Sequence, residues 1–251
     1  MFVPELTAEP GWQAVDFISD LHLQASEPAT FKVWQRYMQT TPADAVFILG
    51  DLFELWVGDD VLQEPGFEQQ CAQVIRRTSA RVPIFFMRGN RDFLVGNAMM
   101  SECNTTLVDD PTVLIFQHQR WLLSHGDALC LDDVDYMQFR QQVRSADWQQ
   151  VFLAKPLNER QATARGLRQQ SETRKASGMA QIDVDAHAAQ RLLQQAASAT
   201  LIHGHTHKPA IHDLGEGMSR VVLSDWDAAA APPRAEVLRL SAQGLNRVHS
   251  V

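Results

Sequence analysis

Eight short apolar runs constrain the fold of this chain more than any other sequence feature. They are rich in Val, Ile, Leu and Phe, and their length suits buried strands better than helices. Along the chain they read AVDFIS, AVFILG, VPIFFM, TVLIF, RWLLS, TLIH, RVVLS and AEVLRL. We therefore predict a fold whose core is built of β-sheet.

Helical segments alternate with the first of these runs. Residues 31–39 and 67–77 are helix candidates, and alternation of strand and helix is typical of α/β folds. The later runs lie closer together, which favours hairpins and hence a mixed sheet or two packed sheets. A chain of 251 residues that is 45% hydrophobic can bury one large core. We predict one α/β (α+β) domain over residues 1–251.

Residues 132–199 differ from the rest of the chain because they are rich in Gln, Ala and Arg and compatible with several amphipathic helices. We predict a helical insertion here. Between 136 and 175 the segment carries about +5 in a chain of net charge -8. This charge fits either a solvated helix face or a lid that meets an anionic ligand or membrane surface. The basic residues are Arg140, Arg144, Lys155, Arg160, Arg165, Arg168, Arg174 and Lys175.

Composition narrows the classes of partner and compartment. The net charge of -8 argues against non-specific binding to nucleic acid. Cys71, Cys103 and Cys130 are odd in number and form no CxxC pair, so we expect neither a disulfide framework nor a zinc-thiolate site, and a reducing compartment. The first residues lack the features of a secretory signal. No apolar run approaches the roughly 18 residues that cross a bilayer, so we expect any membrane contact to be peripheral.

Five of the apolar runs end in side chains that bind metal ions. Taken singly, each has an ordinary interpretation: an aspartate after a strand as a turn or cap residue, Asn90 as a left-handed turn, His125 as a core histidine. Together they supply two Asp, one Asn and four His at strand ends, where α/β folds collect their chemistry. Together these candidates are sufficient to form a two-metal site. Its members are Asp20, His22, Asp51, Asn90, His125, His205 and His207.

The blocks DLH, GDLFELW, RGNRD, HGD and GHTH occur in the order found in the calcineurin-like metallophosphoesterases, and the resemblance spans Asp20 to His207. It implies a two-layered mixed β-sandwich flanked by helices, with two metal ions at one end and Asp51 bridging them. By this resemblance the first metal is held by Asp20, His22, Asp51 and His207, and the second by Asp51, Asn90, His125 and His205. His203 then faces the substrate, supports the ligands, or belongs to the core.

The donor set and the bridging arrangement indicate the chemistry. Oxygen and nitrogen donors without thiolate, around ions with open positions, favour Mn²⁺ or a similar octahedral ion over structural zinc, and we expect two Mn²⁺ ions per chain. Such a pair activates a water for in-line attack on phosphorus. We predict three catalytic residues, which are Arg91, Asp51 and His125.

Arg91 stands where many members of the family have a histidine that protonates the leaving alkoxide. Arginine stays charged near neutral pH, so it is a poor general acid but a good ligand for phosphate oxygens. An anhydride expels a phosphate, whose second pKa is only about 6, and needs no such acid. The substitution therefore favours an anhydride substrate.

The amino-acid sequences of these blocks, together with the Arg- and Gln-rich insertion that follows, resemble those of the UDP-2,3-diacylglucosamine diphosphatases of lipid A biosynthesis. This resemblance implies hydrolysis of UDP-2,3-diacylglucosamine to UMP and 2,3-diacylglucosamine 1-phosphate. It also implies a peripheral enzyme at the cytoplasmic face of the inner membrane of a Gram-negative bacterium, with no obligate protein partner.

The same resemblance implies a set of substrate contacts. Asp133 and Tyr136 follow the HGD block at the expected positions. Ser171, Arg174 and Lys175 match less well and fit a surface role equally. Glu54, Trp56, Asp59 and Asp60 are expected to shape their loop or to support the metal ligands. The full set of expected substrate contacts is Asn90, Arg91, Asp133, Tyr136, Ser171, Arg174, Lys175 and His205.

Two other functions stay open at this point. One is a generic phosphodiesterase or protein phosphatase on the same fold, although the chain has no block like GDYVDRG. The other is a non-catalytic metal-binding or scaffold protein, which the retention of all seven candidate ligands disfavours.

Overall fold

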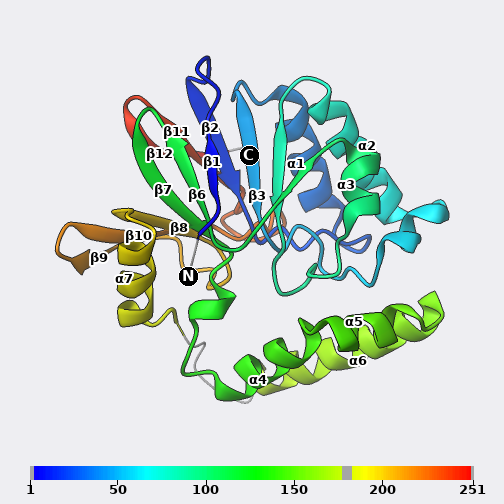
Figure 1. Cartoon of the computed structure of the whole chain (residues 1–251). Helices are drawn as coiled ribbons and strands as arrows, with labels where there is room; N and C mark the ends of the chain where they lie inside the picture. The colour runs from blue at the N-terminus through cyan, green and yellow to red at the C-terminus, as the bar shows by residue number, and fades with distance from the viewer. Residues whose placement is uncertain (1–2, 177–182, 250–251) are drawn as a thin grey trace.

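Two six-stranded sheets pack face to face in the computed structural model, which describes residues 3–176 and 183–249 (Figure 1). The first sheet has the strand order β1 (Glu5–Thr7), β6 (Thr112–Phe116), β7 (Gln119–Ser124), β8 (Thr200–His203), β10 (Met218–Val222) and β9 (Ile211–Gly215). The second has the order β12 (Gly244–His249), β11 (Glu236–Ser241), β2 (Ala14–Ile18), β3 (Ala45–Leu49), β4 (Ile84–Met87) and β5 (Thr106–Val108).

Both sheets are mixed. Strands β2 to β5 run parallel, as expected where helices connect the strands, while β11 pairs antiparallel with β2. The later part of the chain forms the antiparallel hairpins β6–β7, β9–β10 and β11–β12. The predicted shift from alternation to hairpins is therefore confirmed.

Side chains of the central strands alternate between two cores because successive residues of a strand point to opposite faces. In β3, Phe47 and Leu49 face the other sheet, where they meet residues such as Leu114 and Ile202. Val46 and Ile48 point the other way, to the helices. Strands buried on both faces read as continuous apolar runs, which is why the sequence marked them so clearly.

Helices cover the outer faces of the sandwich. Helices α1 (Pro28–Thr40), α2 (Phe67–Ser79) and α3 (Asn97–Cys103) pack on the second sheet. Helix α7 (Ala186–Gln195) buries Ala189 and Leu193 against the first sheet. The sandwich flanked by helices agrees with the expected fold class.

Helices α4 (Val134–Val143), α5 (Ala146–Leu153) and α6 (Leu157–Ala176) form a layer of their own beside the sandwich (Figure 1). We call α4–α6 the lid. Phe152 is buried and joins the core that also holds α1 to α3, with Trp148 stacked on it at a ring distance of 4.6 Å. The predicted helical range 132–199 thus contains the lid and also α7, which packs on the sheet.

Four strands carry no clear apolar run. Strands β1 and β5 have three residues each, and β9 and β12 lie at sheet edges with half-exposed side chains. Half-exposed edge strands need no continuous hydrophobic sequence, so composition does not reveal them. The short turns η1 (Asp59–Gln63) and η2 (Asp127–Leu129) follow two of the strand-end motifs.

None of the helices within residues 3–176 and 183–249 has both the length and the apolar composition needed to span a bilayer. The three cysteines are buried free thiols.

Candidate metal centre and active site

The seven candidate ligands lie on loops that leave β2, β3, β4, β7 and β8. Five of them have left-handed backbone conformations, with φ between 48° and 68°. Such angles are uncommon for residues other than glycine and concentrate at functional sites. The surrounding structure therefore holds these backbones in an uncommon conformation, which directs the five side chains toward the candidate site. The five are Asp20, His22, Asp51, His205 and His207.

Hydrogen bonds between the loops fix this geometry. The backbone N–H groups of Asp20 and His22 donate to the carbonyls of Gly50 and Asp51, at 3.2 and 3.1 Å. A Cβ at Gly89 would collide with the Asp51 carboxylate. The glycine of the RGNRD block is therefore required for the close approach of two ligand loops.

Asp20, His22 and His207 form the first candidate group, since one ligand atom of each lies within 4.8 Å of the others. The Nε2 atoms of the two histidines are 3.2 Å apart, and His207 Nε2 is 3.3 Å from Asp20 Oδ1. Ligands about 2.1 Å from a common cation lie about 3 Å from one another. The spacing fits a bound divalent ion.

Asp20, Asp51 and His125 form the second group. Asp51 Oδ1 is 3.7 Å from His125 Nε2, while Asp51 Oδ2 is 4.0 Å from His22 Nε2. Asp20 is common to both groups, and the two oxygens of Asp51 face one histidine of each, an arrangement compatible with a bridging ligand.

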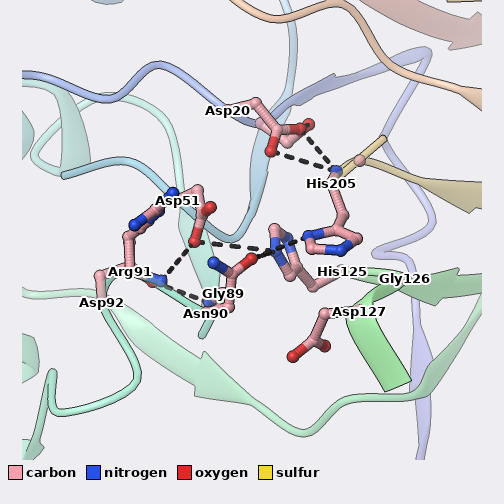
Figure 2. Close-up of polar contacts among 12 residues, drawn as sticks. Asp20, Asp51, Gly89, Asn90, Arg91, Asp92, His125, Gly126, Asp127 and His205 are labelled. Carbon is pink, nitrogen blue, oxygen red and sulfur yellow. Dashed lines mark hydrogen bonds and ion pairs between the residues drawn. The ribbon is translucent and has the colours of Figure 1, made fainter. Parts of the chain in front are cut away.

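Asn90 joins the remaining histidine, His205, to the second group (Figure 2). Its Oδ1 atom lies 2.9 Å from His125 Nε2 and 2.8 Å from His205 Nδ1. The N–H of His205 donates to both oxygens of Asp20, at 2.9 and 3.1 Å. All seven candidate ligands are thus brought together by five loops that are far apart in sequence.

The electrostatics of the cluster suit a cation. Burial by itself raises the pKa of Asp20. The hydrogen bond and charge of His207, with the charges of His125 and His22, outweigh burial and bring this pKa below its usual value, so the carboxylate is ionised. Burial and the charge of His125 lower the pKa of His205 to about 4, which leaves a neutral ring able to bind metal.

His125 behaves differently without a metal. Burial lowers its pKa, but the carboxylates of Asp51, Asp20 and Asp127 raise it to about 9. Its Nδ1 lies 2.9 Å from the Leu49 carbonyl, which fixes the ring and points Nε2 at the site. A cation that binds here displaces the proton on Nε2.

Arg91 lies beside the bridging carboxylate, and its backbone N–H donates to Asp51 Oδ1 at 2.7 Å (Figure 2). Its Nε atom is buried and has no hydrogen-bond acceptor within the described part of the chain. A buried donor without a partner is costly, so this atom suits an anionic ligand.

The expected substrate contacts in the lid have different fates. Asp133 caps α4 by accepting from the N–H of Tyr136 at 3.1 Å. Tyr136 stacks on His205 at a ring distance of 5.9 Å, and its hydroxyl donates to Asp127 at 2.5 Å. The side chains of Ser171, Arg174 and Lys175 lie outside the described residues.

Four basic residues of the lid bind groups of the protein itself. Arg140 Nε donates to Asp127 at 2.8 Å, and Arg144 donates to the Gly89 carbonyl at 2.9 Å. Arg160 is buried and pairs with Asp60, and Arg168 pairs with Glu54. Neither a solvated face nor an external anion explains these four side chains, because they attach the lid to the sandwich.

His203 is buried, with Nδ1 2.8 Å from the Gly204 carbonyl and Nε2 3.4 Å from Arg220. Burial lowers its pKa to about 4. Of the three roles expected for this residue, the structure supports the one in the core.

Sequence reasoning missed two buried carboxylates of the site, although both lie in the quoted blocks. Asp92 accepts from the N–H groups of Gly89 and Leu52 at 2.7 and 2.8 Å and so joins two ligand loops. Asp127 accepts hydrogen bonds from the Tyr136 hydroxyl and from Nε of Arg140 in the lid. Each of these aspartates is the last residue of a quoted block, RGNRD or HGD, and this position could have revealed it. Only Asn90, Arg91 and His125 of the two blocks were assigned roles.

Comparison with known proteins agrees with this geometry. The sequence pattern of the family described as calcineurin-like phosphoesterase matches residues 14–209, and the chain belongs to this family. It is therefore a hydrolase.

Relatives narrow the class further. The chain is 47% identical over 220 residues to a protein of Chromobacterium violaceum named UDP-2,3-diacylglucosamine hydrolase, covering 85% of this chain and 90% of that one. It is 44% identical over 218 residues to a protein of the same name from Cellvibrio japonicus, covering 84% and 90%. A solved archaeal phosphodiesterase aligns over 94% of this chain and 98% of its own, with 11% identity and a TM-score of 0.47.

Proposed function

We propose that this protein hydrolyses the diphosphate of UDP-2,3-diacylglucosamine to UMP and 2,3-diacylglucosamine 1-phosphate, a step of lipid A biosynthesis. The observation that carries the proposal is the convergence of seven oxygen and nitrogen donors beside Arg91, in a chain whose relatives bear that substrate in their names.

We propose two Mn²⁺ ions as cofactors. Asp20, His22 and His207 with Asp51 hold one, and Asp51, Asn90, His125 and His205 hold the other. Carboxylate, amide and imidazole donors without thiolate suit such ions. When bound, they would supply an activated water and positive charge for the phosphate oxygens.

The roles of the protein's own groups follow from their places. Arg91 binds a phosphate oxygen through its guanidinium, whose buried Nε has no acceptor among the described residues. Tyr136 and His205 form one wall of the site. Asn90 Oδ1 and His125 Nε2 lie 2.9 Å apart and would both bind the second ion.

The proposal is tested by incubating the purified protein with Mn²⁺ and UDP-2,3-diacylglucosamine. We expect equal amounts of UMP and 2,3-diacylglucosamine 1-phosphate, and no turnover after chelation of the metal. Release of UDP, or absence of any product, would contradict the reaction. Faster turnover of a cyclic nucleotide or a phosphoprotein would favour the generic phosphodiesterase or phosphatase instead. Comparison of Mn²⁺ with Mg²⁺ and Zn²⁺ tests the choice of metal.

We also propose peripheral binding at the cytoplasmic face of the inner membrane in a Gram-negative bacterium. The substrate carries acyl chains, and large apolar side chains stand exposed on and just before the lid. Flotation with vesicles containing anionic lipid tests this, because a protein that stays at the bottom of the gradient does not bind the membrane surface. The exposed residues are Leu131, Val134, Val151, Leu153 and Leu167.

A further inference from the structure

Glu54 lies between the candidate metal centre and the lid, and each of its carboxylate oxygens faces a different partner. Oε2 is 3.0 Å from Nδ1 of His22. Oε1 pairs with Nε of Arg168, on the fourth turn of α6. Glu54 is only 7% exposed, so its charge depends on these two partners and not on water.

The sandwich, and not the lid, sets the position of Glu54. Its N–H donates to the Leu23 carbonyl at 3.2 Å, and the N–H of Leu23 donates to Leu52 at 2.9 Å. These bonds join the loop of Asp20 and His22 to the loop that follows Asp51. The sandwich therefore positions the backbone of Glu54, while the orientation of its carboxylate depends on its two partners, His22 and Arg168.

The contact with His22 has a direct consequence for metal binding. The carboxylate makes an ion-pair contact with Nδ1 that lacks hydrogen-bond geometry, and its charge favours a proton on Nδ1, which leaves the opposite nitrogen, Nε2, available as a ligand. His22 Nε2 is the atom that lies 3.2 Å from Nε2 of His207 in the first candidate group. Loss of the carboxylate would free the ring to rotate away from that group.

We propose that Glu54 is a positioning residue that couples lid docking to metal binding, an inference that rests on the metal centre proposed above. Arg168 holds the carboxylate against His22 when the lid is docked, and a cation on His22 holds the carboxylate for Arg168. By thermodynamic linkage, metal then stabilises the docked lid by the same factor by which the docked lid stabilises bound metal.

A second arginine–carboxylate pair provides a matched control. Arg160 of α6 pairs with Asp60 and also donates to the Val57 carbonyl. Asp60 lies in the η1 turn, and its described contacts lead to Arg160 and to none of the seven candidate ligands. Both pairs attach the same helix, but only the pair of Glu54 continues to the metal centre.

The test uses the full-length protein after removal of metal, titrated with Mn²⁺ alone. We expect Glu54→Gln to weaken Mn²⁺ binding about 10- to 100-fold, the usual effect of losing the partner of a ligating histidine. Asp60→Asn should bind Mn²⁺ as the wild type does, because the lid stays docked through Phe152 and Arg168 and Glu54 keeps its contact with His22. Equal affinity of Glu54→Gln and wild type, or equal weakening by both substitutions, would overturn the coupling.

Hydrogen exchange supplies a readout that is independent of activity. Mn²⁺ should slow amide exchange in the lid about fivefold or more in the wild type and in Asp60→Asn, the lower end of ordinary coupling between sites. In Glu54→Gln and Arg168→Gln this effect of Mn²⁺ should vanish. Persistence of the effect in Arg168→Gln contradicts the proposal even if Glu54→Gln does not fold.

Failure of this inference is distinguishable from failure of the proposed function. A wild-type protein that binds no Mn²⁺ contradicts the metal centre itself. A wild type that binds Mn²⁺ and turns over the nucleotide lipid, with Glu54→Gln unchanged in affinity and lid exchange, contradicts only the coupling.

Discussion

Asp51 illustrates how much depends on single residues of the centre. It is 2% exposed, has a left-handed backbone, and faces both candidate groups with one carboxylate. Its Oδ1 also accepts from the N–H of Arg91. One side chain thus organises the ligands of both proposed ions and the residue proposed to bind phosphate.

We expect Asp51→Ala to abolish activity and to weaken both metal sites together, because one carboxylate serves two ions. Metal content after dialysis against Mn²⁺ measures the effect. Asp213→Ala, on the edge strand β9, is the control and should retain metal. Selective loss of a single ion from the Asp51 variant would contradict a bridging role.

Arg91→Ala should lower turnover about 10²- to 10³-fold while metal content stays intact, because the guanidinium stabilises charge on the substrate and binds no metal. Arg91→Lys should recover only part of the loss, since an ammonium lacks the planar fork. Steady-state kinetics and metal analysis on the same samples check this. Loss of metal from Arg91→Ala would show that its role has been misassigned.

At the scale of elements, Phe152 is the one described lid residue that is fully buried in the core shared with α1 to α3, at 4% exposure. Trp148, Leu157 and Ala164 pack against the same core while partly exposed, and arginines supply the polar contacts. Elements held by few buried contacts open more readily than the core of a domain. The lid is therefore the element whose stability can be changed separately.

Phe152→Ala removes a buried aromatic ring, a change that costs about 3–5 kcal/mol in protein cores. We expect proteolysis within 134–169 to become much faster while the thermal unfolding of the sandwich changes little. The neighbouring Val151 is 66% exposed, so Val151→Ala is the control and should leave the rate within about twofold. A drop in sandwich stability that matches the loss in the lid would show that the two unfold as one unit.

At the scale of the whole molecule, the thiols report on the integrity of the sandwich. Cys71, Cys103 and Cys130 are buried, and burial raises the pKa of each, to about 12 for Cys103 and Cys130. Thiolates are the reactive form, so folded protein should be protected.

We expect alkylation of all three thiols to be slow in native protein, and to stay slow as the pH rises from about 7 to about 9, because this range lies below the raised pKa values. Protein unfolded in guanidinium should react at the rate of a free thiol and faster at higher pH. Mass spectrometry of the labelled chain counts the modified cysteines. Rapid labelling of the native protein would show that the core opens.

The strands that are buried on both faces, and the candidate ligands of the centre, could be predicted from the sequence alone. Val46 to Leu49 form a continuous apolar run because both sides of β3 are covered, and such a run is visible in composition. The edge strands β9 and β12 and the short β1 and β5 were not visible, since they are held by pairing with neighbours and not by their own hydrophobicity. The ligand blocks were recognisable because metal chemistry restricts the residue types at each position.

The partners of the lid arginines, and the contact between Glu54 and the candidate ligand His22, could be found only in the folded chain. Arg160 and Arg168 look alike in sequence, yet one ends at Asp60 and the other continues through Glu54 to His22. The partner of a long charged side chain depends on which distant segment the fold brings within reach. Periodicity and composition carry local information, whereas the two lid contacts join Arg160 to a residue 100 positions away and Arg168 to a residue 114 positions away, and only the packed chain specifies them.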